Sequence, residues 1–540
     1  MTDPQEPRHD DYRRSGRWRD QTFLDDLRRG VLAYPGKPAV VARDVAAGTT
    51  RVLDYAELAL LTDRCAGALV ELGLVPGDVV AVQLSNRWEL APLVLGCIRA
   101  GVKLCPLVPE YRRRELEHML RLTEARVFIT MPEWKSVPLA DIGVGLAEEL
   151  PGLRHVAVAG GERPGGTLDF GAYFFGTAWE DEHSLEGREL GPDDPFLVLF
   201  TSGTTGEPKG ALHTQNTLYA PIRGEADVFG LGAELVMTVA SIYTHYSGMV
   251  QGMFMPLMLG GTMAFQDTWA GPDLLDLIER HGVTFLYVTP TYLLDLLDAQ
   301  RERPRDTSGL RRIVTGSAPV PPHLVDEVRD AFGVRLYALW GMTENGPVTI
   351  TRPDDPDDWA AYSDGRPIDG MEVRIDPIPG RPETDGGRLW VRGPTQCLGY
   401  YRREQLYADY LDEGGWFNTG DLARDDGRGG IRMVGREKDL ILRHGFPIPV
   451  AEVEAVLARH PAVREVAVLG IPDTHDDETV CAVITPVDEP PRLEELRAYL
   501  DEAGMTEWFW PERLELVDAL PKTITGKIRK VELQQRFHDT

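Results

Sequence analysis

The sequence predicts an α/β protein with a large, layered N-terminal domain that includes a β-rich subdomain, and a small α+β domain at the C-terminal end. Length is one reason, because 540 residues are too many for one hydrophobic core. Candidate strands and helices also alternate along most of the chain, which is typical of helices layered on parallel strands. The pattern changes to short strands and turns near Gly370, and a βαβ-like unit begins near Lys438. We therefore expect domains at 1–437 and 438–540, with the β-rich subdomain at about 370–437.

The individual elements follow from short apolar runs bounded by turn residues and from longer runs with helical spacing. Buried strands are expected at 79–84, 125–130, 196–200, 261–266, 285–288 and 334–336. Helices of the large domain are expected at 55–74, 89–100, 274–280 and 291–299. The β-rich subdomain should hold strands at 372–375, 388–391 and 430–433. The small domain should hold helices at 450–459 and 493–503 and strands at 466–469 and 480–485.

Composition favours an enzyme that acts on a small-molecule substrate. The chain has 57 Lys and Arg residues against 85 Asp and Glu residues, and its formal net charge is −28. Such an acidic surface repels nucleic acids and anionic membranes, so neither is an expected partner. No apolar run approaches the roughly 18 residues of a membrane helix, and the N-terminus lacks the apolar core of a signal peptide, so a cytoplasmic location is expected. The oligomeric state is left open, and a homodimer is one option.

The cysteines are scattered, without the spacing of a metal site or of a disulfide framework. We expect them to be small buried apolar side chains, and we predict no structural metal. The five residues are Cys65, Cys97, Cys105, Cys397 and Cys481.

The most informative segment runs from Phe200 to Thr214 and reads FTSGTTGEPKGALHT. Eight of the ten residues from Thr201 to Gly210 are Thr, Ser, Gly or Lys. Glycines let backbone N–H groups turn toward one point, and hydroxyls and an ammonium add donors, so the loop can surround a phosphate group. Its spacing is not that of a Walker A loop. The candidate phosphate ligands are Thr201, Ser202, Gly203, Thr204, Thr205, Gly206 and Lys209.

This loop resembles the signature of the adenylate-forming superfamily, which contains acyl- and aryl-CoA ligases, peptide-synthetase adenylation domains and luciferases. Trp-Gly-Met-Thr-Glu at 340–344 is similar to the superfamily's aromatic-Gly-x-Thr-Glu motif. A carboxylate beside a phosphate loop can hold Mg²⁺, and a tryptophan can offer its face to a purine. The resemblance implies that Thr343 contacts the phosphate of AMP and that Glu344 binds Mg²⁺. Trp340 is implied to lie by adenine, and Gly341 and Met342 are expected to be further nucleotide-binding residues.

Further segments point to the nucleoside. An acidic side chain can accept hydrogen bonds from both ribose hydroxyls, although a lone Asp421 would most often cap a turn. Gly-Arg-Glu-Lys-Asp at 435–439 resembles the superfamily's hinge. This resemblance implies that Arg436 joins Asp421 near the ribose and that the small domain is mobile about Lys438. A turn implied to line adenine and the acyl group is formed by Gly316, Ser317 and Ala318.

Two segments concern the acid and the reaction. Residues 520–528, Leu-Pro-Lys-Thr-Ile-Thr-Gly-Lys-Ile, resemble the superfamily's final motif. The resemblance implies that Lys527 neutralises charge that develops between the carboxylate and the α-phosphate, where a positioned cation is worth most. His-Tyr-Ser-Gly, beginning at His245, is similar to a motif at the acyl pocket, and a core histidine is the alternative interpretation. The implied catalytic residues are Lys527, Lys209, Thr343, Glu344 and His245.

The implied reaction joins a carboxylate to AMP. ATP, Mg²⁺ and the acid would give acyl-AMP and PPi by in-line attack on the α-phosphorus, and by family default CoA would then displace AMP. Segments 108–112, 364–367 and 510–514 are most similar to medium-chain or alicyclic acyl-CoA ligases.

The small domain departs from that subgroup on the face that should meet CoA. At 443–448 it reads Arg-His-Gly-Phe-Pro-Ile, where these ligases usually have Arg-Gly-Gly-Glu-Asn-Ile. Glu507 and Phe509 stand in a segment that usually carries lysines. Because lysines can pair with the phosphates of CoA, their replacement argues against strong CoA binding.

Two functional hypotheses follow. The first is an acid–CoA ligase for an aryl, alicyclic or short acyl acid. The second is an ATP-dependent diazotase of bacterial secondary metabolism, which activates nitrite with AMP for attack by an aryl amine and needs no CoA. A non-catalytic binding protein is disfavoured, because the chain retains the residues of the implied machinery, Lys209, Glu344, Asp421, Arg436 and Lys527.

Overall fold

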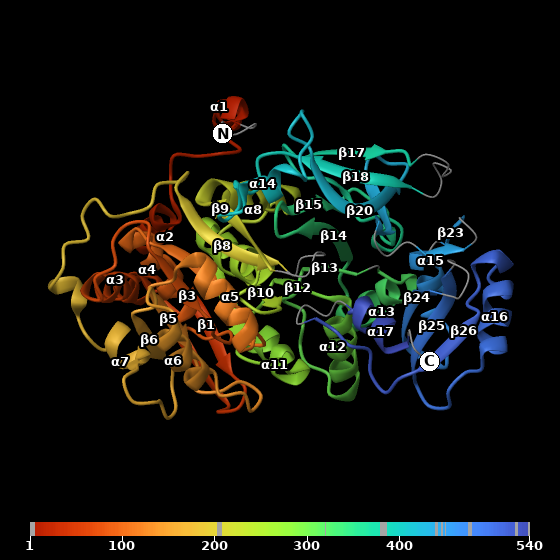
Figure 1. The fold of residues 1–540 in the computed structure, drawn as a ribbon, viewed down its shortest axis with the longest axis horizontal. Coiled ribbons are helices and arrows are strands. Elements are labelled where there is room, and N and C mark those ends of the chain that lie inside the picture. Colours follow the sequence, from red (N-terminus) through yellow and green to blue (C-terminus); the bar gives the residue numbers. More distant parts are fainter. Residues whose placement is uncertain are drawn as a thin grey trace.

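The computed structural model describes residues 6–201, 208–318, 320–378, 386–437, 441–443, 446–448, 450–472, 478–523 and 528–537. In this part of the chain, a large body built on two wide sheets is followed by a smaller C-terminal part at one end of the molecule (Figure 1). The predicted α/β class, with a large N-terminal and a small C-terminal domain, is confirmed.

One wide sheet has nine strands within the described residues, in the order β16-β15-β14-β13-β12-β10-β11-β1-β2. Its six central strands, from β14 to β1, run parallel, and the strands at both edges are antiparallel to their neighbours. The strands are β1 (Pro38–Asp44), β2 (Thr49–Asp54), β10 (Val236–Ala240), β11 (Thr262–Gln266), β12 (Phe285–Val288), β13 (Arg312–Gly316), β14 (Leu336–Met342), β15 (Gly346–Ile350) and β16 (Arg366–Pro367).

The other wide sheet has eight strands within the described residues, in the order β19-β9-β8-β4-β3-β5-β6-β7. Strands β3 to β8 pair in parallel, whereas β9 is antiparallel to both β8 and β19. The strands are β3 (Val79–Val82), β4 (Lys103–Pro106), β5 (Val127–Thr130), β6 (His155–Val158), β7 (Leu168–Asp169), β8 (Pro195–Thr201), β9 (Lys209–Thr214) and β19 (Gly399–Tyr400).

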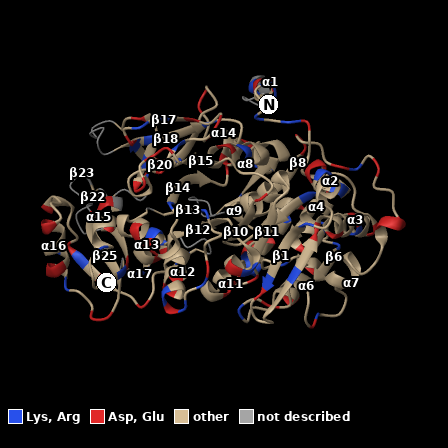
Figure 2. Ribbon diagram, turned by 180° about the vertical axis from the view of Figure 1, so that it is seen from behind, with Lys and Arg blue, Asp and Glu red and all other residues tan. Residues whose placement is uncertain are grey.

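The main hydrophobic core lies where helices from both halves of the large body meet the two wide sheets. Charged side chains gather on the outer helices and loops, while most sheet residues are uncharged (Figure 2). The helices of this body are α1 (Glu6–Arg14), α2 (Phe23–Ala33), α3 (Tyr55–Glu71), α4 (Leu90–Ala100), α5 (Arg113–Thr123), α6 (Leu139–Glu149), α7 (Phe170–Phe174), α8 (Gln215–Phe229), α9 (Tyr246–Met249), the π-helical turn η2 (Val250–Phe254), α10 (Met255–Leu259), α11 (Gly271–His281), α12 (Pro290–Glu302) and α13 (Pro322–Phe332). Short 3₁₀ turns lie at η1 (Trp179–Asp181) and η3 (Trp359–Ala361).

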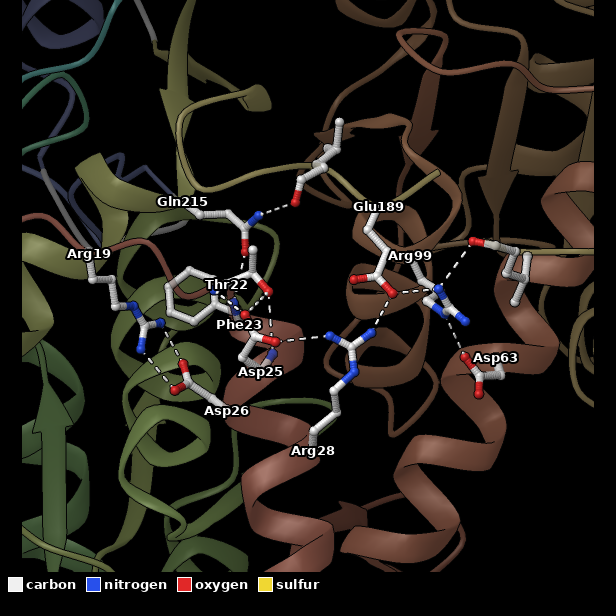
Figure 3. Close-up of polar contacts among 12 residues, drawn as sticks. Arg19, Thr22, Phe23, Asp25, Asp26, Arg28, Asp63, Arg99, Glu189 and Gln215 are labelled. Atoms are coloured by element: carbon white, nitrogen blue, oxygen red, sulfur yellow. Dashed lines mark hydrogen bonds and ion pairs between the residues drawn. The ribbon is translucent and has the colours of Figure 1, made fainter. Parts of the chain in front are cut away.

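Helix α2 ties the N-terminal segment to this body (Figure 3). Thr22 caps the helix in a reciprocal capping box with Asp25. The backbone N–H of Phe23 donates to the side chain of Gln215 on α8, at 2.9 Å. The carboxylate of Asp26 accepts from Arg19, at 2.8 Å to one oxygen and 2.5 Å to the other. The polar groups of this helix start are therefore paired.

The region that starts near Gly370 is rich in strands, as the sequence predicts. Four antiparallel strands form a sheet in the order β17-β18-β20-β21 within the described residues, and this sheet lies beside α14 (Figure 1). The elements are β17 (Glu372–Asp376), β18 (Gly387–Arg392), α14 (Glu404–Ala408), β20 (Phe417–Asp425) and β21 (Ile431–Arg436).

The C-terminal part has hydrophobic clusters of its own. Strands β24 and β25 are antiparallel, and β25, α16 and β26 form a parallel βαβ unit. The elements are β22 (Ile441–Arg443), β23 (Phe446–Ile448), α15 (Val450–Leu457), β24 (Val463–Pro472), β25 (Glu478–Pro486), α16 (Leu493–Glu502), η6 (Glu507–Phe509), β26 (Arg513–Leu516) and α17 (Lys530–Phe537).

Two expectations need correction. The strand expected at 334–336 begins at Leu336 and continues to Met342, so most of the aromatic-Gly-x-Thr-Glu motif lies on the strand and not after it. The parallel arrangement does not hold throughout the sheets, because short connections such as the one between β14 and β15 join antiparallel strands at some of the edges. The five cysteines are buried, as expected. In the described part of the chain, no helix is long and apolar enough to cross a membrane.

Candidate active site

The predicted phosphate loop connects two paired strands. β8 ends at Thr201, β9 begins at Lys209, and these two residues face each other in the antiparallel ladder. The buried apolar residues of β8 fix the base of the loop in the sheet. The remaining candidate phosphate ligands, Ser202, Gly203, Thr204, Thr205 and Gly206, lie outside the described residues.

Lys209 is buried beside two tyrosines. Its ammonium donates a hydrogen bond to the hydroxyl of Tyr410 at 2.6 Å and lies 4.5 Å from the centre of that ring. The ring of Tyr400 is 5.4 Å away. Tyr400 reaches this position because β19 pairs with β9, where it stands opposite Ala211. Hydrogen bonding and cation–π attraction together hold the cation at the base of the loop.

Glu344 lies on the other side of Tyr400. The Tyr400 hydroxyl donates to its Oε1 at 2.8 Å, and its backbone carbonyl accepts from the N–H of Cys397 at 2.8 Å. Burial raises the pKa of Glu344, while the hydrogen bond from Tyr400 and the charges of Lys209 and Arg436 act in the opposite direction. A buried carboxylate favours the approach of a further cation, because an opposite charge nearby stabilises its ionised form.

The residues present fit Mg²⁺, which is usually held by one or two carboxylates, substrate phosphates and water. Glu344 supplies one such carboxylate, next to the predicted phosphate loop. Within the described residues, no group of three or more His, Cys, Asp or Glu side chains could hold a metal by itself.

Thr343 is positioned by His213, which the sequence-based prediction missed. His213 is fully buried on β9, and its Nε2 lies 2.8 Å from the carbonyl oxygen of Thr343. Burial lowers the pKa of His213 to about 4, so the ring is neutral at pH 7. Because a carbonyl can only accept, Nε2 carries the proton. One sequence feature could have identified His213 as a site residue: it lies in the same segment as the phosphate loop, four residues after Lys209.

Asp421, Arg436 and Trp340 come together as predicted for a nucleoside site. Asp421 on β20 and Arg436 on β21 are paired in register, and the Arg436 Nε lies 3.2 Å from a carboxylate oxygen of Asp421. The indole N–H of Trp340 donates to the other oxygen at 3.3 Å. Trp340 stays partly exposed. Gly341 and Met342 follow it at the end of β14 and are also partly exposed.

The turn after β13 lies next to Trp340. Gly316 pairs with Leu339 on β14, and a Cβ on Gly316 would stand 2.5 Å from the Leu339 carbonyl oxygen, so the position requires glycine. Ser317 has a φ of +74° and is exposed, as is Ala318. The turn thus brings the predicted adenine-lining residues beside the tryptophan.

His245 precedes helix α9 and is partly exposed, so it is not a fully buried core histidine. Lys527 and Lys438 lie outside the described residues. The chain on both sides of Lys527 closes through an antiparallel bridge between Lys522 and Ile528. Arg529 lies close enough to Tyr111 of the large body to lower its pKa, which burial raises to about 12. The chain directly after the final motif therefore lies close to the large body.

Comparisons with known proteins agree with this geometry. The family model for AMP-binding enzymes matches residues 27–401, and that for the AMP-binding enzyme C-terminal domain matches residues 452–527. The chain belongs to the AMP-binding enzyme family. The predicted adenylate-forming ligase is thereby confirmed.

Similar AMP-binding enzymes include a medium-chain fatty-acid–CoA ligase from Escherichia coli (strain K12), 30% identical over 536 residues, with 98% of this chain and 93% of the relative covered. The 2,3-dihydroxybenzoate-AMP ligase of Bacillus subtilis (strain 168) is 30% identical over 534 residues, and the match covers 98% of this chain and 96% of the relative. Among solved structures, the anthranilate CoA ligase AuaEII in complex with anthranoyl-AMP has a TM-score of 0.84 at 25% identity. The match covers 96% of this chain and 97% of that structure's chain.

Proposed function

We propose that this AMP-binding enzyme activates a small carboxylic acid as an acyl-AMP mixed anhydride, releases PPi, and passes the acyl group to CoA. The observation that carries the proposal is the convergence of Lys209 and Glu344 on Tyr400. A buried cation and a buried carboxylate are what the phosphates of ATP and their Mg²⁺ require.

Each group has a role that follows from its charge and place. Lys209 neutralises phosphate charge at the base of the loop, and Thr343, fixed through its backbone by His213, offers a hydroxyl to the α-phosphate. Glu344 would hold Mg²⁺, which supplies Lewis-acid stabilisation of phosphate charge when bound. Asp421 and Arg436 orient the ribose. Lys527, arriving from the small domain, would neutralise charge at the reacting carboxylate.

The relatives reported above favour an aryl or fatty acid as substrate, because their names specify dihydroxybenzoate, anthranilate and medium-chain fatty acids. CoA is the acceptor of two of them. Glu507 is exposed on η6 of the small domain. An acidic residue there would repel the phosphates of CoA, so we expect CoA to bind weakly.

The test is an AMP-release assay with purified protein, ATP and Mg²⁺ across aryl, alicyclic and short acyl acids, each with and without CoA. We expect AMP release only with an acid, and a thioester when CoA is added. The diazotase hypothesis stays a prediction, and a parallel arm with nitrite and an aminoaryl acid tests it. AMP release that requires nitrite and ignores CoA would contradict the ligase proposal.

The role of Lys527 has its own test. Lys527→Ala should slow adenylate formation by roughly a hundredfold while ATP binding stays within about threefold of the parent protein. Lys522→Ala is the matched control, because Lys522 lies in the same motif but pairs with Glu465 of the small domain. Equal losses of ATP binding and adenylate formation in Lys527→Ala would overturn the assigned role.

A further inference from the structure

Helix α8 carries a carboxylate, Glu225, that is fully buried. Among the described residues, no donor reaches either of its oxygens in hydrogen-bonding geometry. Burial raises the pKa of Glu225 to about 8, and its polar neighbour Gln251 offsets part of this rise. A buried acid without hydrogen-bond donors destabilises the fold, so its presence requires a reason.

Three other polar side chains surround Glu225, each from a different element. They are Gln251 from η2, Tyr246 from α9 and Tyr287 from β12. The hydroxyl of Tyr246 and the Oε1 of Gln251 are buried and also lack a partner within the described residues. We call these four residues the Glu225 cluster.

The Glu225 cluster adjoins the candidate active site. Tyr246 follows His245, and its ring meets the ring of His213 edge-on at 5.6 Å. A Cβ on Gly346, two residues after Glu344, would stand 2.2 Å from the Tyr246 hydroxyl. A Cβ on Gly316 would stand 3.5 Å from the hydroxyl of Tyr287. The two tyrosines therefore lie between Glu225 and the loops implied to bind the acyl-AMP.

The backbone that carries Gln251 is unusual. Residues Val250–Phe254 form a π-helical turn between α9 and α10, and this turn packs against α8. Such turns are rare and are frequent at functional sites, because the extra residue changes the direction of a side chain. Here the turn places an amide next to a carboxylate inside the core.

We propose that the Glu225 cluster binds an amino group on the acid substrate, and that the enzyme selects an amino-substituted aromatic acid. This inference rests on the proposed function. An amino group brings two donors and can satisfy both Glu225 and Gln251, whereas a hydroxyl brings one. The rings of Tyr246 and Tyr287 suit a flat aromatic substrate. Because the carboxylate must face the phosphate loop, the amino group should stand at the far side of the ring, in the meta or para position.

The first test compares acids that differ only in this substituent. AMP release is measured with benzoate, 3-aminobenzoate, 4-aminobenzoate and 3-hydroxybenzoate. We expect kcat/KM for the better aminobenzoate to exceed that for benzoate at least tenfold, and Glu225→Gln to reduce this ratio at least tenfold. Asp227→Asn is the control, because Asp227 is exposed on the same helix and pairs with Arg223. It should leave the ratio unchanged.

The outcomes separate the two proposals. If no acid supports AMP release, the proposed function fails. If benzoate is used as well as both aminobenzoates, only the amine site fails. If 3-hydroxybenzoate is preferred and Glu225→Gln removes that preference, the cluster binds a hydroxyl and the amine assignment is overturned.

The second test uses only the parent protein, so its result does not depend on whether a variant folds. The titratable groups that face Glu225 or its tyrosine neighbours are Tyr246, Tyr287, His213 and Cys397, and none of them changes charge near pH 7. An amine that donates to Glu225 favours its ionised form, so binding should release up to one proton at pH 7. Calorimetry in two buffers of different ionisation enthalpy would compare stable sulfamoyl-adenosine analogues of 3-aminobenzoyl-AMP, 4-aminobenzoyl-AMP and benzoyl-AMP. Equal proton release by the amino and benzoyl analogues would overturn the proposal.

Discussion

Asp26 on α2 and Glu225 on α8 are both helix carboxylates whose side chains are buried, yet their surroundings are opposite. Asp26 accepts from the guanidinium groups of Arg19 and Arg29 (Figure 3 shows the Arg19 pair). In the described part of the chain, the polar side chains found next to Glu225 are uncharged at pH 7. Removing one partner of a buried ion pair leaves an uncompensated charge, so the fold depends on Asp26 being present. A buried carboxylate that lacks charged partners and hydrogen-bond donors costs stability and is better explained by a ligand.

The largest expected contrast is in stability. Asp26→Asn should lower the free energy of unfolding by about 3–5 kcal/mol, because it leaves the nearly buried Arg19 without its counter-charge. The matched change Glu225→Gln removes no ion pair and should cost under about 1 kcal/mol. Urea unfolding of both variants at pH 7 measures this. Similar losses in the two variants would show that the two carboxylates serve the fold equally.

The pH dependence sharpens the contrast. The pKa of Glu225 is about 8 in the folded chain against an ordinary value of 4.5, so the folded state holds a proton that the unfolded state has released between these values. Stability from this group is therefore full below about pH 4.5 and is lost as the pH rises to 8. The slope should be about 1.4 kcal/mol per pH unit.

The measurement is urea unfolding from pH 5 to 8.5 of the parent protein and of Glu225→Gln. The parent should lose stability with pH more steeply than the variant between pH 5 and 8, and the difference in slope should shrink toward pH 8.5 as Glu225 ionises in the folded state. Parallel curves throughout would mean that Glu225 ionises normally inside the fold.

Glu344 is an intermediate case, a buried carboxylate that has one side-chain donor among the described residues, Tyr400. Tyr400→Phe keeps the ring near Lys209 but removes that hydrogen bond. We expect about 2 kcal/mol less stabilisation of ionised Glu344, seen as a roughly thirtyfold higher Mg²⁺ concentration for half-maximal adenylate formation. Tyr407→Phe is the control, because the hydroxyl of Tyr407 donates to the carbonyl of Cys397 and not to Glu344. An unchanged Mg²⁺ requirement in Tyr400→Phe would show that Tyr400 does not affect metal binding.

The sequence predicts those features that depend on local patterns. Buried strands and the motif residues Lys209, Glu344 and Asp421 can be recognised from short segments, because apolar runs and motifs are local. The link between Lys209 and Glu344 through Tyr400 cannot be recognised in the sequence. It requires β19 to pair with β9, and the two strands are almost 190 residues apart along the chain. Glu225 looks like an ordinary helix residue in the sequence. Only the packing of α8 against β15 and η2 shows that it is buried.

The smallest expected effect concerns Lys209, a buried cation whose partner is a neutral hydroxyl. Tyr410→Phe removes the oxygen at 2.6 Å but leaves the ring face at 4.5 Å, so part of the attraction persists. We expect a loss of about 1 kcal/mol, which is a roughly fivefold rise in the dissociation constant for ATP. Tyr401→Phe is the control, because Tyr401 contacts Arg402. Tighter ATP binding by Tyr410→Phe would mean that the Tyr410 hydroxyl competes with phosphate for the Lys209 ammonium. The neutral partner would then hold the buried charge away from the phosphate instead of orienting it toward the phosphate.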